Sequence, residues 1–92
     1  MIPKRDRVRI MHDMLEVVIH KGNKAKLTHI LYKANLSHNM FTEYMGELMR
    51  RGFVAEDVDQ KERKSYSLTE KGFNFMRDYK VIKDFLDSYG LI

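Results

Sequence analysis

The sequence contains no cysteine, a single proline and no low-complexity stretch or internal repeat. The absence of cysteine excludes disulfide bonds and thiolate metal sites. No run of apolar residues approaches the length that is needed to span a bilayer. The first nine residues are charged and lack the apolar core of a signal peptide. We therefore expect a cytoplasmic protein that has no membrane partner.

Patterns that carry chemistry are also scarce. The four histidines show no pair at three- or four-residue spacing: His12, His20, His29 and His38. With no cysteine to join them, we expect no metal site. No glycine-rich phosphate loop, nucleophile motif or catalytic carboxylate pair stands out. The sequence favours a protein that is not an enzyme and needs no cofactor.

Charge is distributed unevenly along the chain. The 92 residues carry a net charge of +4. Residues 1–35 hold eight basic and three acidic side chains, whereas residues 36–92 hold nine basic and ten acidic ones. The basic excess therefore lies in the first third of the chain. Such an excess indicates a polyanionic partner, although solubility alone explains a modest net charge equally well.

Two helices are expected in the first 35 residues. Over residues 6–21, apolar side chains recur at helical spacing in two rows, which is typical of a helix wedged between neighbours. The first row is Val8, Met11, Leu15 and Val18, and the second is Ile10, Met14 and Val17. Residues 24–34 form a shorter helix, whose inner face holds Leu27, Ile30 and Leu31. Gly22 lies between the two, where a left-handed residue ends a helix.

A tight turn at Asn35 and Leu36 leads into a third helix, which extends to about residue 51. Ser37 is suited to cap it, because its hydroxyl accepts a free first-turn N–H. The inner face consists of Phe41, Tyr44, Met45, Leu48 and Met49. Gly46 lies in mid-helix, where glycine costs about 1 kcal/mol relative to alanine. A close helix crossing would account for it.

After Gly52 the apolar spacing changes from a helical period to a period of two. Residues 53–58 and 65–68 are expected as strands, and the charged segment 59–64 as the loop between them. The segment has no Asn-Gly pair, so the loop is longer than two residues. The sequence therefore predicts a small β-hairpin.

Thr69 caps a last helix over residues 70–89. Five side chains step by four, three, four and three residues, the seam spacing of a coiled coil: Phe75, Tyr79, Ile82, Leu86 and Tyr89. A domain of about 70 residues already has its core, so this stripe needs a partner, and we expect a homodimer. The alternative is that the stripe folds back on its own domain. Phe73 and Met76 are expected to seal that domain.

Three helices, a hairpin and a long helix, in this order, predict a mainly α fold with a small β-hairpin. We expect a winged helix-turn-helix domain over residues 1–70 and a dimerisation helix over residues 71–92. In such a fold the third helix enters the DNA major groove, and the hairpin, or wing, reaches the phosphate backbone. The expected partner is therefore double-stranded DNA, and the expected role is that of a transcription regulator or a nucleoid-associated chromatin protein.

Several segments carry a family resemblance. Residues 30–37 read Ile-Leu-Tyr-Lys-Ala-Asn-Leu-Ser, residues 51–54 read Arg-Gly-Phe-Val, and residues 66–72 read Tyr-Ser-Leu-Thr-Glu-Lys-Gly. With these segments the chain resembles, over nearly its whole length, the archaeal small winged-helix DNA-binding dimers of the 10a type. The resemblance implies a DNA-binding winged domain and an antiparallel coiled-coil dimer made by the last helix.

Nine residues are candidate DNA contacts. Three polar ones lie on the first turns of the third helix: His38, Asn39 and Thr42. Three basic ones lie in the wing, Lys61, Arg63 and Lys64, and three flank the second helix, Lys24, Lys26 and Lys33. The alternative is that these are ordinary solvated side chains. A further basic set either forms an arm on the DNA or lies near the last helix: Arg5, Arg7 and Arg9.

Acidic side chains on the same elements oppose DNA binding. Glu43 and Glu47 are expected on the outer face of the third helix, and the wing carries Glu56, Asp57, Asp59 and Glu62. Acidic groups repel phosphate, although a glutamate can accept a hydrogen bond from cytosine. The second hypothesis is therefore a winged-helix adaptor that binds another protein without binding DNA. Salt-dependent DNA binding separates the two hypotheses.

Overall fold

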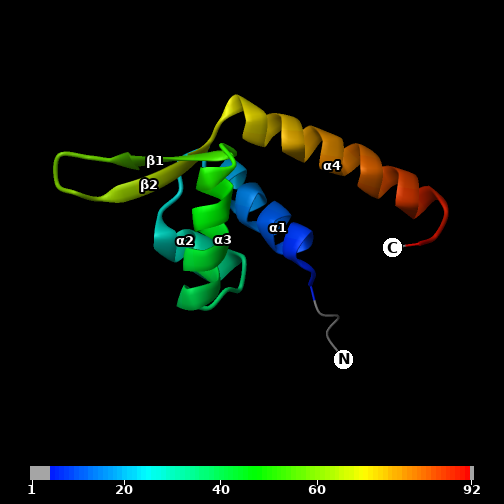
Figure 1. Ribbon diagram of the computed structural model, residues 1–92, viewed down its shortest axis with the longest axis horizontal. Helices are drawn as coiled ribbons and strands as arrows, with labels where there is room; N and C mark the ends of the chain where they lie inside the picture. Colours follow the sequence, from blue (N-terminus) through cyan, green and yellow to red (C-terminus); the bar gives the residue numbers. More distant parts are fainter. Residues whose placement is uncertain (1–4, 92) are drawn as a thin grey trace.

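The computed structural model describes residues 5–91, and residues 1–4 and 92 lie outside the described part. Within it the elements follow in the order α1, α2, α3, β1, β2, α4. Their bounds are Arg7–His20, Leu27–Lys33, His38–Arg50, Val54–Val58, Lys64–Leu68 and Glu70–Ser88. The first three helices lie together, the hairpin projects to one side and α4 extends to the other (Figure 1). This is the predicted winged helix-turn-helix with a long last helix, and none of these helices is long and apolar enough to cross a membrane.

The first helix lies at the centre of the core. Asp6 caps it by accepting a hydrogen bond from the backbone N–H of Arg9 at 2.8 Å. Side chains from both predicted rows are buried: Ile10, Met11, Met14, Leu15 and Val18. Val8, expected in the first row, is half exposed because it lies in the first turn. The helix contacts α2, α3, α4 and β2, so it is wedged between neighbours as predicted.

The second helix begins three residues later than predicted. Ala25 exchanges backbone hydrogen bonds with Tyr66 of β2, at 3.0 and 2.8 Å. Residues 24–26 are thereby held extended beside the hairpin, and the helix starts only after this pairing ends. Asn23 reinforces the same junction, because its side-chain oxygen accepts from the backbone N–H of Leu68 at 2.7 Å. The hairpin is therefore extended by one isolated bridge at Ala25, which the sequence pattern does not predict.

The turn into α3 follows the predicted chemistry. Asn35 is left-handed, with φ of 55°, and the hydroxyl of Ser37 accepts from the backbone N–H of Met40 at 3.1 Å. A close helix crossing, which would have accounted for Gly46, is not found. Apart from the backbone of its own helix, the one neighbour near a Cβ added there is the guanidinium of Arg50, at 3.2 Å. Packing therefore does not require a glycine at this position.

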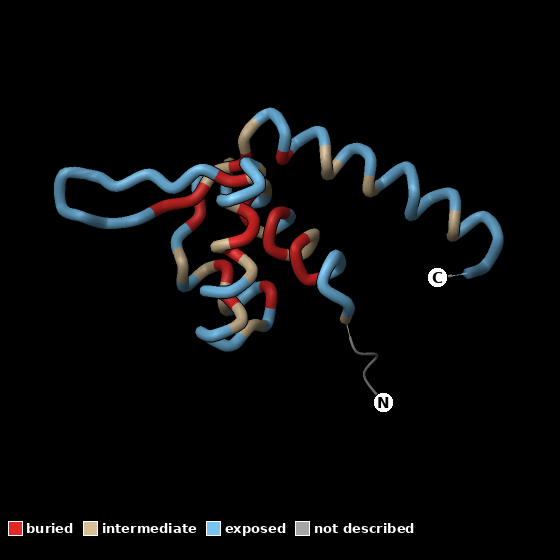
Figure 2. The backbone as a smooth tube through the Cα atoms, viewed as in Figure 1, coloured by how far each residue is buried: buried red, intermediate tan, exposed pale blue. Residues whose placement is uncertain are grey.

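The hairpin is packed only at its base. β1 and β2 are antiparallel, with Val54 opposite Leu68 and Val58 opposite Lys64. Val54, Tyr66 and Leu68 are buried, whereas the tip is exposed (Figure 2). The strands meet through residues 59–63, which confirms that the loop is longer than two residues.

The start of α4 lies against the exit of α3. The Thr69 hydroxyl accepts from the backbone N–H of Gly72 at 3.2 Å and donates to the Gly52 carbonyl at 2.5 Å. Gly72 is buried, and a Cβ added there would collide with the carbonyl oxygen of Phe53. Only glycine permits this close approach of helix to backbone.

The two halves of α4 have different environments. Phe75 and Met76 pack against the core. The ring of Tyr79 stacks on the ring of His12 of α1, with ring centroids 4.2 Å apart. Beyond Tyr79 the helix leaves the domain and is largely exposed (Figure 2). The expectation that Met76 seals the domain is confirmed, whereas the same expectation for Phe73 is wrong. Phe73 is 43% exposed, because Gly72 occupies the buried side of the first turn.

The two helical glycines are expected to respond oppositely to the same substitution. Gly72→Ala forces the start of α4 away from Phe53 and should lower the free energy of unfolding by about 2 kcal/mol. Gly46→Ala meets no backbone and should raise it by about 1 kcal/mol, because alanine favours the helix. Urea denaturation of the two variants and the parent measures both changes. Equal effects of the two substitutions would contradict the close approach at Gly72.

Candidate nucleic-acid interface

The first turns of α3 present a polar surface. His38, Asn39 and Thr42 are all exposed. The Thr42 hydroxyl donates to the His38 carbonyl of its own helix at 3.0 Å, which leaves the hydroxyl oxygen free to accept from an outside donor. Because the inner face of α3 is buried through Phe41 and Met45, a rigid element holds these three side chains.

A groove of about 690 Å³ lies between α3, the start of α2 and β2, and is named here the wing groove. It brings together five of the predicted contacts: Lys26, His38, Thr42, Arg63 and Lys64. Its floor is apolar and is formed by Leu27, Phe41, Met45, Met49 and Tyr66. Burial, with a smaller contribution from Glu56, raises the pKa of Tyr66 to about 12, so the phenol stays neutral. No carboxylate lines the groove, and its rim is therefore positive.

The other predicted contacts lie outside this groove. Lys24 lines a smaller neighbouring hollow, which also contains Asp57 and Asp59 and shares Lys26, Arg63 and Lys64 with the wing groove. Asn39 and Lys61 are exposed on either side of the wing groove, at the start of α3 and at the tip of the hairpin. Lys33 lies apart, in a hollow with Glu16, His20 and Lys21 between α1 and α2. The structure therefore gathers most of the predicted set on one side and leaves Lys33 on another.

Asp59 is exposed, and its carboxylate organises the wing loop. Its carboxylate accepts from the backbone N–H groups of Lys61 and Arg63 at 2.8 and 2.9 Å. It also accepts from Arg63 Nε at 2.8 Å. The hydrogen bonds from Arg63 and Lys61 lower the pKa of Asp59. The acidic side chain thus sets the conformation of the loop that presents the basic ones.

The expectation that Glu47 lies on the outer face of α3 is wrong. Glu47 is only 8% exposed, and its two carboxylate oxygens pair with Arg7 of α1 and with Arg51 one helical turn later. The Arg51 Nε to Glu47 Oε1 distance is 2.8 Å. A buried carboxylate requires such partners, because an unpaired charge is costly away from water. Glu43 remains exposed on α3.

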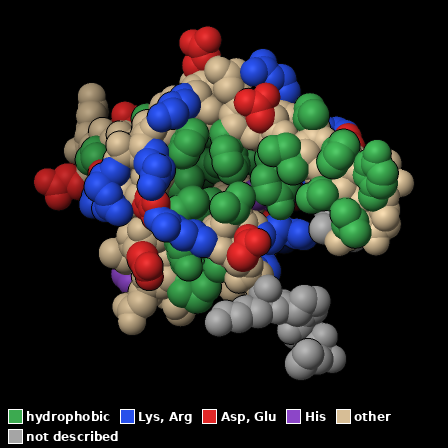
Figure 3. All heavy atoms as spheres, turned by 45° about the vertical axis from the view of Figure 1, so that its right-hand side comes forward, with side chains coloured by type: hydrophobic (Ala, Val, Ile, Leu, Met, Phe, Trp, Pro, Cys, Tyr) green, Lys and Arg blue, Asp and Glu red, His purple; other side chains and the backbone are tan. Residues whose placement is uncertain are grey.

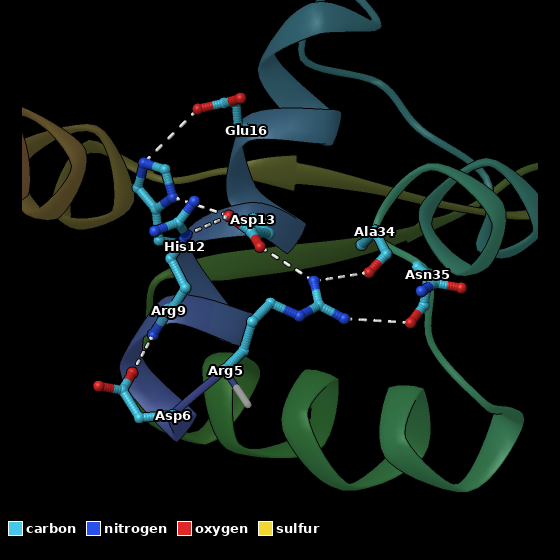
Figure 4. A network of polar contacts seen from close by, with 8 residues as sticks. All are labelled: Arg5, Asp6, Arg9, His12, Asp13, Glu16, Ala34 and Asn35. Carbon is cyan, nitrogen blue, oxygen red and sulfur yellow. Dashed lines mark hydrogen bonds and ion pairs between the residues drawn. The ribbon is translucent and has the colours of Figure 1, made fainter. Parts of the chain in front are cut away.

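Arg5 is a bracket across the domain and not an arm. One guanidinium nitrogen donates to Asp13 of α1 at 2.9 Å and to the Ala34 carbonyl at 2.8 Å. The other donates to the Asn35 carbonyl at 3.1 Å. Figure 4 shows this side chain reaching from the start of α1 to the turn before α3. These hydrogen bonds of Arg5 fix the turn that precedes α3. Arg5 lies 29 and 30 residues from Ala34 and Asn35, so no local sequence pattern reveals the contact.

Asp13 also links this bracket to α4. Arg9 Nε donates to Asp13 at 3.2 Å (Figure 4) and also interacts with Tyr79. His12, whose Nδ1 lies 3.1 Å from Asp13, stacks on the Tyr79 ring. Arg9 therefore lies near the last helix, one of the two positions considered for it. Across residues 5–91, no cluster of three His, Asp or Glu side chains is arranged to hold a metal ion.

The three-helix core, the wing and the helix-turn-helix define a winged helix-turn-helix protein. The chain belongs to the winged helix-turn-helix family, whose model matches residues 4–87. It is similar to Sso10a-2, a DNA-binding protein from Sulfolobus solfataricus, with 25% sequence identity and a TM-score of 0.75. That match covers 94% of this chain and 90% of the Sso10a-2 chain. The resemblance to small archaeal winged-helix proteins is thereby confirmed.

Other similarities are to parts of larger proteins. An uncharacterized protein of Methanocaldococcus jannaschii is 36% identical over 69 residues, which are 75% of this chain and 29% of that protein. The chain thus spans less than a third of this relative. The PcaV transcriptional regulator of Streptomyces coelicolor shares the fold, with a TM-score of 0.78 at 18% identity over 87% of this chain and 60% of that one. MepR, a transcription regulator of Staphylococcus aureus, also shares the fold, with a TM-score of 0.74 and 18% identity. That match covers 87% of this chain and 59% of the MepR chain.

Stability is expected to depend on pH through Asp13. Burial alone would raise the pKa of this carboxyl, but hydrogen bonds from Arg5, His12 and Arg9 hold it below the ordinary 3.8. A carboxyl with a lowered folded pKa adds stability above its unfolded pKa and loses it as the pH falls through the folded value. Asp13→Asn should therefore lower the free energy of unfolding at neutral pH by about 1 to 2 kcal/mol, after allowance for solvent screening.

This difference should shrink as the pH is lowered through and below 3.8, because the parent then loses the same charge. Urea denaturation across the acidic pH range measures it. Asp78→Asn is the matched control: its pair with Arg77, at 3.5 Å, is exposed and should contribute about 0.5 kcal/mol or less. A gap between Asp13→Asn and the parent that stays constant with pH would argue against the bracket.

Proposed function

We propose that the protein binds double-stranded DNA at the nucleoid, as a transcription regulator or a chromatin-associated protein, and acts by binding rather than by catalysis. The observation that carries this proposal is the wing groove. Its positive rim, formed by Lys26, Arg63 and Lys64, adjoins the exposed start of α3. Membership of the winged helix-turn-helix family and the similarity to the DNA-binding protein Sso10a-2 support the same conclusion.

In this proposal α3 enters the major groove and the wing lies on the phosphate backbone. His38, Asn39 and Thr42 contact base edges or the flanking phosphates, because they are the exposed polar side chains of the first turns. The rim lysines and Arg63 neutralise phosphates, and Lys24 and Lys61 extend this contact at either side. Lys33 faces another surface and makes no contact with the same duplex.

The structure accounts for two of the six acidic residues that opposed DNA binding, whereas Glu56, Asp57 and Glu62 stay exposed on the wing. Glu47 is paired inside the domain, and Asp59 is bonded to its own loop. Glu43 is left as the exposed carboxylate on α3, where it can accept from a cytosine amino group. The adaptor hypothesis loses the acidic helix face on which it depended.

Fluorescence anisotropy of labelled duplex DNA tests the function directly. Log K should fall linearly with log salt, at about 0.9 per phosphate neutralised. Lys64→Glu should weaken binding at least tenfold and reduce the salt slope by about 1. Lys33→Glu makes the same change of charge away from the groove and should have a much smaller effect. Absence of binding even at low salt would reject the DNA function in favour of the protein adaptor.

The outer half of α4 and the residues directly after it carry an apolar stripe that nothing in the same domain covers. Its members are between 59% and 69% exposed: Val81, Ile82, Phe85, Tyr89 and Leu91. In Figure 3, hydrophobic side chains gather at the centre of the view and again at the right, where the outer half of α4 comes forward. An uncovered apolar stripe of this kind marks an interaction surface. We propose that it pairs with the same stripe of a second copy in an antiparallel coiled coil.

The proposed seam differs in part from the predicted one. Phe75 and Tyr79 pack on their own domain, as the alternative interpretation allowed, so they stabilise the base of α4. Ile82 and Tyr89 remain free for a partner, and Leu86 is half-buried beside them. We retain the proposed division into a winged domain over residues 1–70 and a dimerisation helix over residues 71–92. The base of α4 then packs on the winged domain while it forms part of the dimerisation helix.

Dimerisation through α4 predicts a defined mass in solution. Sedimentation equilibrium should give twice the chain mass of 11.0 kDa for the parent. Phe85→Lys places a charge in the stripe and should give the single-chain mass with an unchanged helical spectrum, because Phe85 supports nothing in its own domain. Lys83→Gln, on the polar side of the same helix, should remain dimeric. A monomeric parent would reject the α4 dimer.

A further inference from the structure

The wing groove has a chemical character that DNA phosphates do not require. Phosphates are satisfied by the cations of the rim and by water, and an apolar floor offers them no hydrogen bond. The floor nevertheless consists of aliphatic, thioether and aromatic side chains from three elements. Its volume of about 690 Å³ lies within the usual range of small-molecule sites, roughly 300 to 1,000 Å³.

Gly46 keeps this groove open. It lines the groove from the middle of α3, and a side chain there would occupy part of the space. Neither a left-handed backbone nor a close backbone approach requires glycine at this position. The helix nevertheless bears the cost of about 1 kcal/mol that a central glycine imposes. A function of the open space accounts for this glycine, whereas the fold does not.

The charges around the groove specify the sign of an occupant. Arg63 is engaged by Asp59 at 2.8 Å, but within residues 5–91 neither Lys26 nor Lys64 takes part in an ion pair. No carboxylate lines the groove itself; Asp57 and Asp59 lie in the neighbouring hollow, which shares Lys26, Arg63 and Lys64 with it. Two unpaired ammonium groups above an apolar floor are complementary to a molecule that has an anionic head and an apolar body.

We propose that the wing groove binds an amphipathic organic anion, such as an aromatic carboxylate or sulfonate, and that this ligand competes with DNA. The apolar body lies on the floor against Phe41, Met45 and Met49, and the anionic head lies at Lys26 and Lys64. The competition rests on the proposed function, because the ligand neutralises the same cations that would contact phosphate. A ligand that binds only the DNA-free protein lowers the affinity for DNA by linkage.

The methionine methyl groups provide an internal map of the site. Met45 and Met49 line the groove, whereas Met11, Met14 and Met76 lie elsewhere in the domain. In NMR spectra of isotope-labelled methionine methyl groups, naphthalene sulfonate should shift the Met45 and Met49 signals and leave the other three in place. Naphthylmethylammonium, which has the same ring system and the opposite charge, should shift neither. Unmoved groove signals, or equal shifts with both probes, would overturn the proposal.

Two substitutions of one residue separate occupancy of the groove from damage to the fold. Gly46→Phe fills the groove and should weaken naphthalene sulfonate binding at least tenfold. Gly46→Ala adds a single methyl group and should retain most of the binding. The Met11 and Met14 signals report whether each variant keeps its core. Undiminished binding to a folded Gly46→Phe variant would place the probe elsewhere, for example on the α4 stripe, and would overturn the proposal.

The competition is tested by adding naphthalene sulfonate to a preformed complex with labelled duplex DNA. In the parent, the probe should lower the anisotropy by displacing the DNA. In Gly46→Phe, the same displacement should need at least a tenfold higher probe concentration, which would support a shared site. Simultaneous binding of probe and DNA would overturn the competition. If the protein binds no DNA even without the probe, only the proposed function is rejected. The methyl shifts then still decide whether the groove binds an organic anion.

Discussion

The position of the wing relative to α3 depends on one pair of backbone hydrogen bonds, between Ala25 and Tyr66. A two-stranded hairpin is marginal in water by itself, so the domain must hold it. Tyr66 also packs its ring edge-on against the ring of Phe41 of α3, with ring centroids 5.7 Å apart. Through these contacts β2, which begins at Lys64, is held against α3, which begins at His38. The wing groove exists because both of its walls are held from this point.

The sequence predicts the regular elements well and the long-range partners poorly. Helical spacing and the caps at Ser37 and Thr69 are local, and they place α1, α3 and α4 to within one or two residues. The start of α2 is missed because a strand partner 41 residues away overrides helical spacing at Ala25. Seam spacing likewise continues unchanged through α4 and does not reveal where the domain ends. Most of the candidate contacts converge, since the fold itself brings α3 beside the wing.

Pairing, more than composition, sets the electrostatic character of this surface. Asp13, Glu47 and Asp59 each accept from an arginine of their own domain, so they contribute little free negative charge. Arg51 lies four residues after Glu47, a pairing that a helix makes visible in the sequence, whereas Arg7 joins from another helix and gives no such signal. Because these pairs also engage Arg5, Arg51 and Arg63, the free positive charge at the rim of the wing groove rests on Lys26 and Lys64.

The outer half of α4 touches nothing in its own domain, so its length is not constrained by the core. Each added residue lengthens a helix by 1.5 Å, and one extra heptad would move the end of α4 by about 10 Å. In the proposed dimer this displacement corresponds to about three base pairs along a duplex. In such a dimer the separation of the two winged domains can therefore change through insertions in one solvent-exposed segment, while the winged domain itself stays the same.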